Sequence, residues 1–508
     1  MLKIFKSIFN RLFIVGFSIL AQLVLFFFIL FRLNEYFTVF SILMNVLSFV
    51  VAVFIINRDM ITEAKISWII VALILPVFGP VLYLIFSNYQ LSKREKKSQD
   101  KIYPKFFQFI KNDIDCHEKV SDIAHKYKGQ FQYIHNVTGL PAYKNTRTTF
   151  YPMGEDFFKS LIDELQKAEK YIFMEYFIVD DGIMWQRIFD VLKLKASQGV
   201  DVRFVYDDLG TVKTLAWNFP DILKKHGIKC VKFNPFKPVV SERHNNRDHR
   251  KITVVDGKTA FVGGINIADE YINKKERFGI WKDSAVMLQG DAVKSFVLLF
   301  LKSYCMQSGE TEDFSPYLDA IHSTFDDNDV IMPYGDEPNP EDMSYVAENV
   351  YLNIINQAEK YLWITTPYLI IDEKMENALI RASQRGVDVR IVTPHIPDKK
   401  IVFAITRASY QKFIAAGIKI FEYTPGFIHS KQVLCDDVIS TVGTVNLDYR
   451  SFIHHYECGV LMYNDSCNKD IKRDFENMFE ISMNMKDFKQ NRFVLMLCRI
   501  MMAFTPML

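Results

Sequence analysis

The sequence has little that would build a disulfide framework or a metal site. Its seven cysteines form no CxxC pair and no cluster with histidine, and they lie at positions 116, 230, 305, 435, 458, 467 and 498. An odd and scattered set is typical of reduced thiols, some of them buried as small hydrophobic side chains. The acidic pairs Asp207-Asp208 and Asp436-Asp437 lack further carboxylates at metal-site spacing. We therefore expect neither a metal ion nor another cofactor.

An excess of charge of one sign is also missing. The chain has 61 Lys and Arg against 59 Asp and Glu, which gives a net charge of +2. A charge this small does not indicate a nucleic-acid-binding protein. Apolar residues are abundant instead: 49% of the residues are hydrophobic and 14% aromatic, and the excess lies mostly before residue 90. At 508 residues the chain is expected to hold more than one domain.

The apolar excess falls in long runs near the N-terminus. Residues 12–31 and 36–56 carry no charge. Each run is long enough to cross a hydrocarbon core of about 30 Å, since a helix rises about 1.5 Å per residue. A cleaved signal peptide is the alternative for the first run, because Lys3, Lys6 and Arg11 precede it. The length of the run, the lack of an A-x-A-like site and the second run close behind it favour an anchor.

A third apolar run, residues 66–86, is interrupted by Pro76, Gly79 and Pro80. Such a run is either a third span or a re-entrant segment that folds back inside the membrane. Two spans and a re-entrant segment place the basic N-terminus and the basic residues 91–97 both in the cytoplasm, as the positive-inside rule prefers. We therefore expect a multi-pass protein of the cell membrane, with its catalytic part in the cytoplasm.

Beyond the anchor the chain repeats itself. QKAEKYIFMEYFIVDDG from Gln166 is similar to NQAEKYLWITTPYLIIDE from Asn356, and KASQGVDVRFVYDD from Lys195 is similar to RASQRGVDVRIVTPH from Arg381. Apolar β-branched runs that alternate with helical patterns predict an α/β architecture. Two similar halves predict a pseudo-two-fold pair whose equivalent sites meet at one interface.

The predicted boundaries follow changes in composition. A stretch rich in Asp, Pro and Gly, FDDNDVIMPYGDEPNPED, separates the halves near residue 330. The apolar C-terminal segment is short and interrupted, so it is either an interfacial helix or a helix docked on the core. The predicted order is a membrane anchor (1–88), a charged linker (89–130), a first domain (131–330), a second domain (331–490) and the C-terminal segment (491–508).

One stretch in each half carries the chemistry. HRKITVVDGKTAFVGGIN begins at His249 and HSKQVLCDDVISTVGTVN begins at His429. A single HxK is usually a solvated strand end, but here five positions match in a fixed register of 180 residues. The matched pairs are His249/His429, Lys251/Lys431, Asp256/Asp436, Gly263/Gly443 and Asn266/Asn446.

The spacing of the motif predicts a site for an anionic phosphodiester. Residues two apart on a strand share a face, so His249 and Lys251 point the same way, as do His429 and Lys431. Lysine provides a point charge for phosphate oxygens, and fixed cations stabilise charge that grows at phosphorus. One histidine then attacks phosphorus, while the other protonates the leaving alcohol and deprotonates the acceptor.

HxK(x4)D followed by GGxN or GTxN, twice in one chain, resembles the phospholipase D superfamily, and more narrowly the bacterial cardiolipin synthases. The segments that carry the resemblance are LPVFGPVLYLIF, RDHRKITVVDGKTAFVGGINIADEY, ITTPYLIIDE, IHSKQVLCDD and GTVNLDYRSF. The resemblance implies duplicated phospholipase D-type domains and a metal-independent transfer through a phosphohistidine. One phosphatidylglycerol would donate its phosphatidyl group to a second, which yields cardiolipin and glycerol.

The resemblance also implies roles for the repeated positions. His249 and His429 are the reactive pair; in the family the first is more often the nucleophile, but the symmetry of the repeat leaves this open. Asp256 and Asp436 complete the motif, and their place beside a turn predicts a structural role. The phosphate-binding positions are Lys251, Lys431, Asn266 and Asn446.

Two further carboxylates match the family's pattern. Glu457, 28 residues after His429, stands where the family keeps a carboxylate that orients the histidine, and Asp283 is its counterpart in the first half. The run Ile-His-His-Tyr before Glu457 departs from the Leu-Asn-Phe type run of many relatives. This departure leaves the acceptor side of the reaction open.

Three alternatives remain for the function: a hydrolytic phospholipase D or related phosphatidyltransferase, a membrane-bound nuclease of the same superfamily, and an inactive membrane scaffold. The intact anchor and the modest charge disfavour the nuclease, and two complete sets of His, Lys and Asn disfavour the scaffold. The DG-x2-AR pattern of the metal-dependent CDP-alcohol transferases is absent. The expected partners are phosphatidylglycerol and membrane lipid, without nucleic acid or an obligate protein partner.

Overall fold

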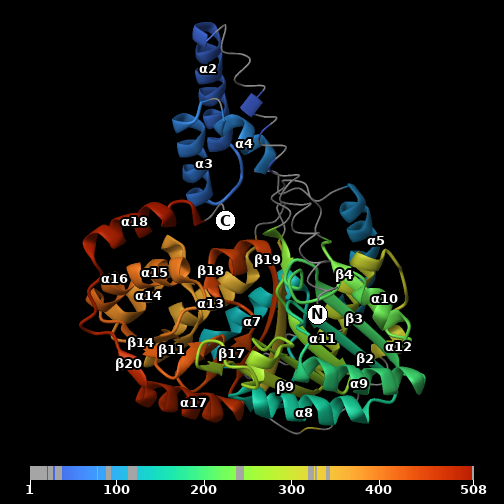
Figure 1. Ribbon diagram of the computed structural model, residues 1–508. Helices are drawn as coiled ribbons and strands as arrows, with labels where there is room; N and C mark the ends of the chain where they lie inside the picture. Colours follow the sequence, from blue (N-terminus) through green and yellow to red (C-terminus); the bar gives the residue numbers. More distant parts are fainter. Residues whose placement is uncertain are drawn as a thin grey trace.

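The fold is an α/β body with a helical stalk on one side (Figure 1). The computed structural model describes residues 37–505 without 77, 87–92, 112–122, 236–244, 319–324, 326–328 and 339–343, together with Leu20, Val24, Phe27 and Phe28. Apart from those last four residues, the first predicted span and the basic residues before it lie outside the described part of the chain.

Three helices form the stalk: α2 (Phe37–Ile56), α3 (Thr62–Ile74) and α4 (Gly79–Phe86). Their shared core consists of Val51, Ile55, Trp68, Ala72 and Tyr83. Gly79 starts α4 directly against α3, where a Cβ atom would lie 2.3 Å from the carbonyl oxygen of Val71. The third apolar run is thus broken into two short helices that pack on each other. Among the described residues, no helix is long and apolar enough to cross a membrane.

The first half of the body is built on a seven-stranded sheet. Its order is β1 (Thr146–Tyr151), β9 (Ala285–Gly290), β7 (Thr259–Gly263), β6 (Lys251–Val255), β2 (Tyr171–Tyr176), β3 (Asp201–Asp207) and β4 (Lys229–Phe233). The side chains of β2 are buried on both faces of the sheet. Phe173 packs in the core with α11 (Val293–Ser308), whereas Ile172 and Met174 pack with α8 (Gly154–Lys167) and α9 (Ile183–Ser197).

The second half repeats this plan, which confirms the predicted duplication. Strands β17-β16-β11-β13-β14 follow the same order as β7-β6-β2-β3-β4. The sheet runs β10 (Val330–Asp336), β19 (His455–Tyr463), β17 (Ile439–Gly443), β16 (Gln432–Cys435), β11 (Tyr361–Thr365), β13 (Asp388–Pro394), β14 (Lys419–Tyr423) and β20 (Ser482–Asn484). Its helices are α13 (Val346–Gln357), α14 (Glu373–Gln384), α15 (Lys400–Ala408), α16 (Tyr410–Ala415), α17 (Cys467–Ile481) and α18 (Arg492–Met502).

The halves also exchange strands and share one core. β5 (Arg247–Asp248) of the first half pairs with β19, and β8 (Ile280–Lys282) of the first half pairs with β15 (Gly426–Ile428) of the second. One hydrophobic cluster contains Val262 from the first sheet and Val442 and Val460 from the second. The two halves are therefore joined where the repeated motifs lie.

Two helices from the region of the predicted linker pack on this body. α5 (Lys93–Lys111) contributes Ile102 and Phe106 to the shared core, and α7 (His125–Thr138) packs beside α13 of the second half. The remaining elements are α10 (Phe219–Lys224), η3 (Asp269–Ile272), α12 (Ser315–Leu318), β12 (Leu369–Ile370), β18 (Leu447–Asp448) and η4 (Arg450–His454).

Candidate active site

The two motif histidines lie at the junction of the halves. β5 ends immediately before His249, whose main-chain N–H donates to the carbonyl oxygen of Tyr456 in β19 at 2.9 Å. β15 ends immediately before His429, whose N–H donates to the carbonyl oxygen of Lys282 in β8 at 2.7 Å. Each histidine is therefore positioned by the backbone of the opposite half.

The two carboxylates pair with the histidines across the junction. Nδ1 of His249 lies 2.9 Å from Oε1 and 3.1 Å from Oε2 of Glu457, which belongs to the second half. Nδ1 of His429 lies 2.7 Å from Oδ2 of Asp283, which belongs to the first half. A carboxylate that accepts from Nδ1 favours the tautomer in which Nε2 carries the lone pair. Both rings then offer Nε2 for chemistry.

Each lysine of the motif is buried beside its histidine. The Nζ atoms of Lys251 and Lys431 donate to the carbonyl oxygens of His249 and His429, respectively. Nζ of Lys431 also lies 2.8 Å from Nδ1 of His429. Burial lowers the pKa of Lys251 to about 8 and the pKa of Lys431 to about 7, against the attraction of nearby carboxylates. An anionic phosphate that enters the site favours the charged form of both lysines.

Burial also sets the charge of the other groups. It lowers the pKa of both imidazoles well below their usual value. Burial raises the pKa of Asp283 to about 7, although Lys431 opposes this shift. Burial acts to raise the pKa of Glu457 as well, but His249 and His455 outweigh it and hold this pKa below its usual range. The two halves therefore offer their histidines carboxylates of different proton affinity.

The two carboxylates differ in their hydrogen bonds because the GGxN and GTxN stretches differ at one residue that lies beside them. In the second half the hydroxyl of Thr444 donates to Oε2 of Glu457. In the first half the equivalent residue is Gly264, where a Cβ atom would lie 2.1 Å from Oδ1 of Asp283. A hydrogen bond to the charged form stabilises it, so Thr444 supports the carboxylate of Glu457 in a way that Gly264 does not support Asp283.

The motif aspartates lie in turns and not at the histidines. Asp256 and Asp436 follow β6 and β16 with φ angles of 53° and 55°. The carboxylate of Asp256 accepts from the N–H groups of residues 169, 170 and 171 at 2.7–2.8 Å. Asp436 accepts from residues 359, 360 and 361 at 2.8–2.9 Å. Each aspartate thus ties the hairpin to the start of the central strand.

We expect Asp256→Ala to destabilise the protein and Asp256→Asn to do so much less. Alanine leaves three main-chain donors without their acceptor, each at a cost of about 1–3 kcal/mol where water cannot replace it. Asparagine keeps one acceptor oxygen and tolerates a positive φ angle. Thermal unfolding of the two variants in detergent measures the difference. Equal losses of stability in both variants would contradict this account.

The motif asparagines differ in their contacts. Oδ1 of Asn266 accepts from the N–H of Ile178 at 2.9 Å, and its Nδ2 donates to the hydroxyl of Tyr271 at 2.8 Å. Oδ1 of Asn446 is buried and makes no hydrogen bond among the described residues. Each stands 17 residues after the motif histidine of its own half, and its role toward phosphate stays a prediction.

Sequence reasoning missed the rings around the histidines. Tyr271 and Trp281 lie 5.5 Å and 5.7 Å from His429, measured between ring centroids. Phe177 and His455 lie 5.1 Å and 5.2 Å from His249. None of these residues belongs to the repeated motif, so no spacing singled them out.

Buried ion pairs hold the stretch that carries His249. Arg247 pairs with Asp207 at 2.8 Å, and Arg250 pairs with Glu175 at 2.9 Å. Both arginines are almost fully buried. Removing one member of such a pair leaves an uncompensated buried charge, so these pairs fix residues 247–250 against strands β3 and β2 of the first sheet.

Two α/β halves that each supply a His-Lys motif to one junction define a phospholipase D-like protein. The family described as cardiolipin synthase, PLD-like domain, matches residues 161–292 and 351–479, and the family described as phospholipase D-nuclease N-terminal matches residues 46–88. The chain belongs to the cardiolipin synthase family of phospholipase D-like proteins.

Relatives support this assignment over most of the chain. An uncharacterized protein of Streptococcus mutans is 44% identical over 84% of this chain and 92% of its own length. A cardiolipin synthase of Halalkalibacterium halodurans is 34% identical over 86% of both chains, and cardiolipin synthase 2 of Bacillus anthracis is 34% identical over 85% of this chain and 84% of its own. The phosphatidylserine synthase of Haemophilus influenzae has the same fold, with a TM-score of 0.57, 15% identity, and coverage of 76% of this chain and 100% of that one.

Proposed function

We propose that this protein makes cardiolipin by moving a phosphatidyl group from one phosphatidylglycerol to another through a phosphohistidine. The observation that carries this proposal is the crossed pair of His249 with Glu457 and His429 with Asp283. Both imidazoles are held with Nε2 available, and a buried lysine lies beside each of them.

In the first step Nε2 of His249 attacks phosphorus of the donor phosphatidylglycerol. The N–P bond forms as the bond to the oxygen of the glycerol headgroup breaks, and protonated His429 gives its Nε2 proton to that oxygen. The phosphodiester charge favours the protonated form of His429 once substrate is bound.

In the second step a hydroxyl of the second phosphatidylglycerol headgroup attacks the phosphohistidine. His429 takes the proton of this hydroxyl, the new P–O bond forms and the N–P bond to His249 breaks. The charges of Lys251 and Lys431 stabilise the phosphoryl oxygens in both steps. These side chains supply the nucleophile, the acid, the base and the positive charge, so the proposed reaction requires no metal ion.

We assign the role of nucleophile to His249. Its ring becomes cationic on phosphorylation and stays so until the acceptor attacks. The carboxylate that faces this ring is contacted through both oxygens and accepts from the Thr444 hydroxyl, whereas Asp283 has no matching hydroxyl at Gly264. The better supported carboxylate suits the ring that must hold the positive charge.

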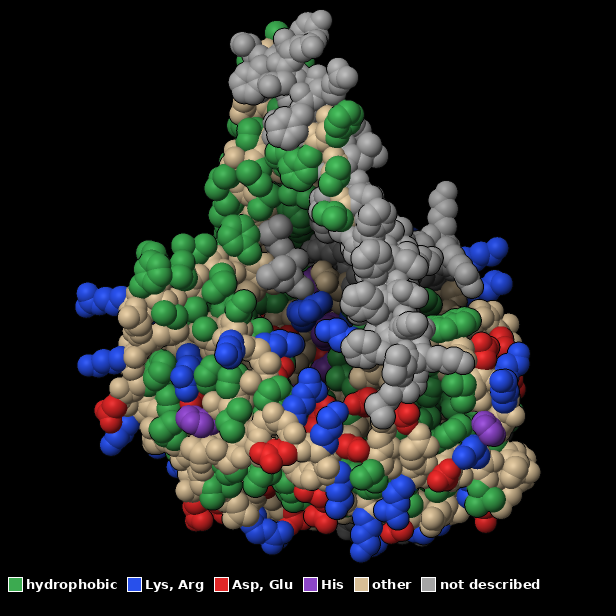
Figure 2. All heavy atoms as spheres, in the orientation of Figure 1, with side chains coloured by type: hydrophobic (Ala, Val, Ile, Leu, Met, Phe, Trp, Pro, Cys, Tyr) green, Lys and Arg blue, Asp and Glu red, His purple; other side chains and the backbone are tan. Residues whose placement is uncertain are grey.

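The substrate is expected to reach this site from a lipid surface on the side of the stalk. Among the described side chains of α2, ten large apolar ones are exposed, and the helix has no charged residue over Phe37–Ile56. Figure 2 shows hydrophobic side chains gathered over the stalk and α18, whereas acidic and basic side chains spread over the rest of the visible body. Apolar surface of this extent is typical of membrane contact.

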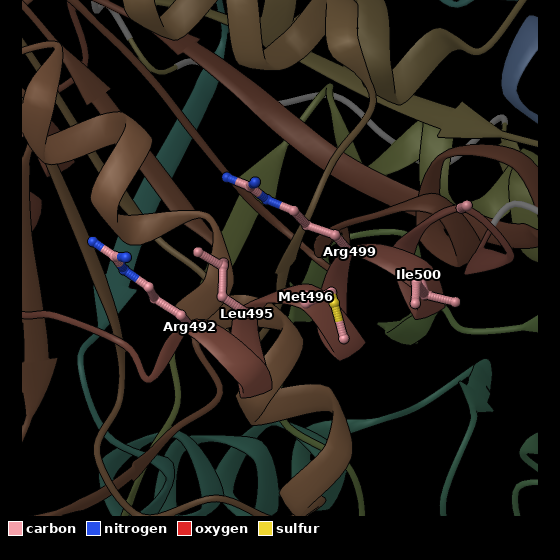
Figure 3. Close-up of a pocket in the computed structure, with 6 residues that line it drawn as sticks. Arg492, Leu495, Met496, Arg499 and Ile500 are labelled. Carbon is pink, nitrogen blue, oxygen red and sulfur yellow. The ribbon is translucent and has the colours of Figure 1, made fainter.

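Helix α18 supports the same placement. Its inner face packs through Cys498 in a cluster with Ile370 and Ile405. Its outer face exposes Phe493, Met496, Leu497 and Ile500. Arg492 and Arg499 extend to one side of the helix and line a shallow depression (Figure 3). An outward apolar stripe edged by arginines suits a helix that is docked on the core and rests in the lipid interface.

The proposal therefore divides the chain by task. Residues 1–88 anchor it in the cell membrane, residues 89–130 link the anchor to the body, residues 131–330 and 331–490 form the two catalytic halves, and residues 491–508 touch the lipid. The basic flanks predict that the catalytic halves lie in the cytoplasm.

Labelled phosphatidylglycerol in vesicles, incubated with the purified full-length protein and a chelator, tests the function. We expect labelled cardiolipin and free glycerol in equal amounts, at a rate that the chelator does not reduce. Phosphatidic acid without cardiolipin would identify a hydrolase, and loss of activity in the chelator would contradict the metal-independent reaction.

A further inference from the structure

A third histidine, His455, lies beside His249 and has no part in the reaction above. Its side chain is nine-tenths buried, with 10% exposed. The two imidazoles share one carboxylate: Oε1 of Glu457 lies 2.9 Å from Nδ1 of His249 and 3.6 Å from Nδ1 of His455. Nδ1 of His455 makes no hydrogen bond among the described residues. A buried imidazole nitrogen thus faces the carboxylate of Glu457 at 3.6 Å without forming a hydrogen bond to it.

These three side chains have the donors and the spacing of a transition-metal site. One ligand atom from each of His249, His455 and Glu457 lies within 4.8 Å of the other two. In tetrahedral zinc sites, bonds of about 2.0–2.2 Å place neighbouring ligand atoms roughly 3.3 Å apart. The two distances from Oε1 of Glu457, 2.9 Å and 3.6 Å, fall on either side of that spacing. Two imidazoles and one carboxylate suit zinc and similar ions better than magnesium or calcium.

We propose that His249, His455 and Glu457 bind Zn²⁺ or a similar first-row transition-metal ion, and that the bound ion inhibits the enzyme. The ion is an inhibitor and not a cofactor, since the proposed reaction uses none. Three protein ligands leave a fourth position for water or a phosphate oxygen. The binding part of this proposal stands on the geometry alone; the inhibitory part rests on the proposed function of His249.

Inhibition follows from the tautomer of His249. The reaction needs the ring proton on Nδ1, facing Glu457, and the lone pair on Nε2. A metal ion at Nδ1 displaces that proton, so the neutral ring carries its single proton on Nε2 and loses the lone pair that attacks phosphorus. The ion also occupies the carboxylate that would stabilise the phosphorylated ring.

Among the described residues, no equivalent metal site surrounds His429. Trp281 stands two residues before Asp283, as His455 stands two residues before Glu457. Its ring centroid is 5.7 Å from that of His429. An indole N–H is a donor only and cannot ligate a metal ion. The proposed inhibition therefore acts on one histidine of the pair.

Binding is tested first, without any use of activity. Full-length protein in detergent, freed of metal with a chelator, is titrated with Zn²⁺ by calorimetry and with Co²⁺ by visible absorption. We expect one tight site per chain, with an affinity weaker by at least about 10- to 100-fold in His455→Asn, since loss of even an outer-shell partner of a ligand costs that much. His226→Asn, which removes an exposed histidine elsewhere, should bind as the unchanged protein does. Absence of tight binding, or equal binding in His455→Asn, would overturn the site.

Inhibition is tested on the same three proteins with phosphatidylglycerol vesicles, each rate being divided by the metal-free rate of that protein. We expect Zn²⁺ to inhibit the unchanged protein and His226→Asn reversibly, and to inhibit His455→Asn only at about 10-fold or higher concentration. Tight binding without inhibition would overturn the inhibitory role while leaving the site in place. If the protein makes no cardiolipin at all, the proposed function fails, but the binding result still decides the site.

Discussion

The single variants His249→Asn and His429→Asn should each form cardiolipin about 10³-fold more slowly or worse, because each lacks a group that forms or breaks a bond in the reaction. The two losses should not add in the double variant, since the histidines act as a unit. Formation of labelled cardiolipin from phosphatidylglycerol measures all three variants. His226→Asn is the matched control, because it changes an exposed histidine away from the site.

The two single variants are expected to be blocked at different steps of the reaction, and this difference shows which histidine is the nucleophile and which is the acid. With a phosphatidyl donor whose leaving group is a phenolate, departure needs little protonation. His429→Asn should then still phosphorylate His249 and accumulate the phosphohistidine, because the acceptor lacks its base. His249→Asn should form no covalent intermediate with the same donor. Mass spectrometry of the quenched protein locates the modified histidine. A phosphatidyl group on His429 would reverse the assignment of the nucleophile.

Much of this arrangement was predictable from the sequence. Five positions repeated at 180 residues predict His249 and His429 as the candidate reactive pair, and the duplicated α/β order follows from the VDVR and AEKY stretches. The aspartates of the motif were also predictable as structural, since Asp256-Gly257 reads as a turn. Such features are predictable because the geometry of a strand or a turn depends on residues that are close together in the sequence.

What depends on contacts between distant strands was not predictable. The crossing of Glu457 to His249 follows from β5 pairing with β19, and that of Asp283 to His429 from β8 pairing with β15. The approach of His455 to His249 has the same origin. Likewise, the predicted linker lacks a long apolar pattern, yet α5 places Ile102 and Phe106 in the shared core because a few apolar positions suffice on one face.

Because each carboxylate contacts the histidine of the opposite half, a substitution in one half is expected to disable the histidine of the other. Glu457→Gln keeps the size of the side chain but no longer selects the tautomer with the proton on Nδ1 of His249. An amide in place of such a carboxylate lowers turnover by about 10⁴-fold in the serine protease triad, and we expect a loss of about 10³- to 10⁴-fold here. Asp283→Asn should cause a comparable loss through His429.

The phenolate donor shows which histidine each carboxylate serves. Glu457→Gln should behave like His249→Asn and form little phosphohistidine, although Glu457 lies in the second half of the chain. Asp283→Asn should behave like His429→Asn and accumulate phosphohistidine on His249. Thermal unfolding of both variants checks that the shared core survives. If Glu457→Gln instead accumulates the intermediate, each carboxylate serves the histidine of its own half, and the junction of β5 with β19 does not set the chemistry.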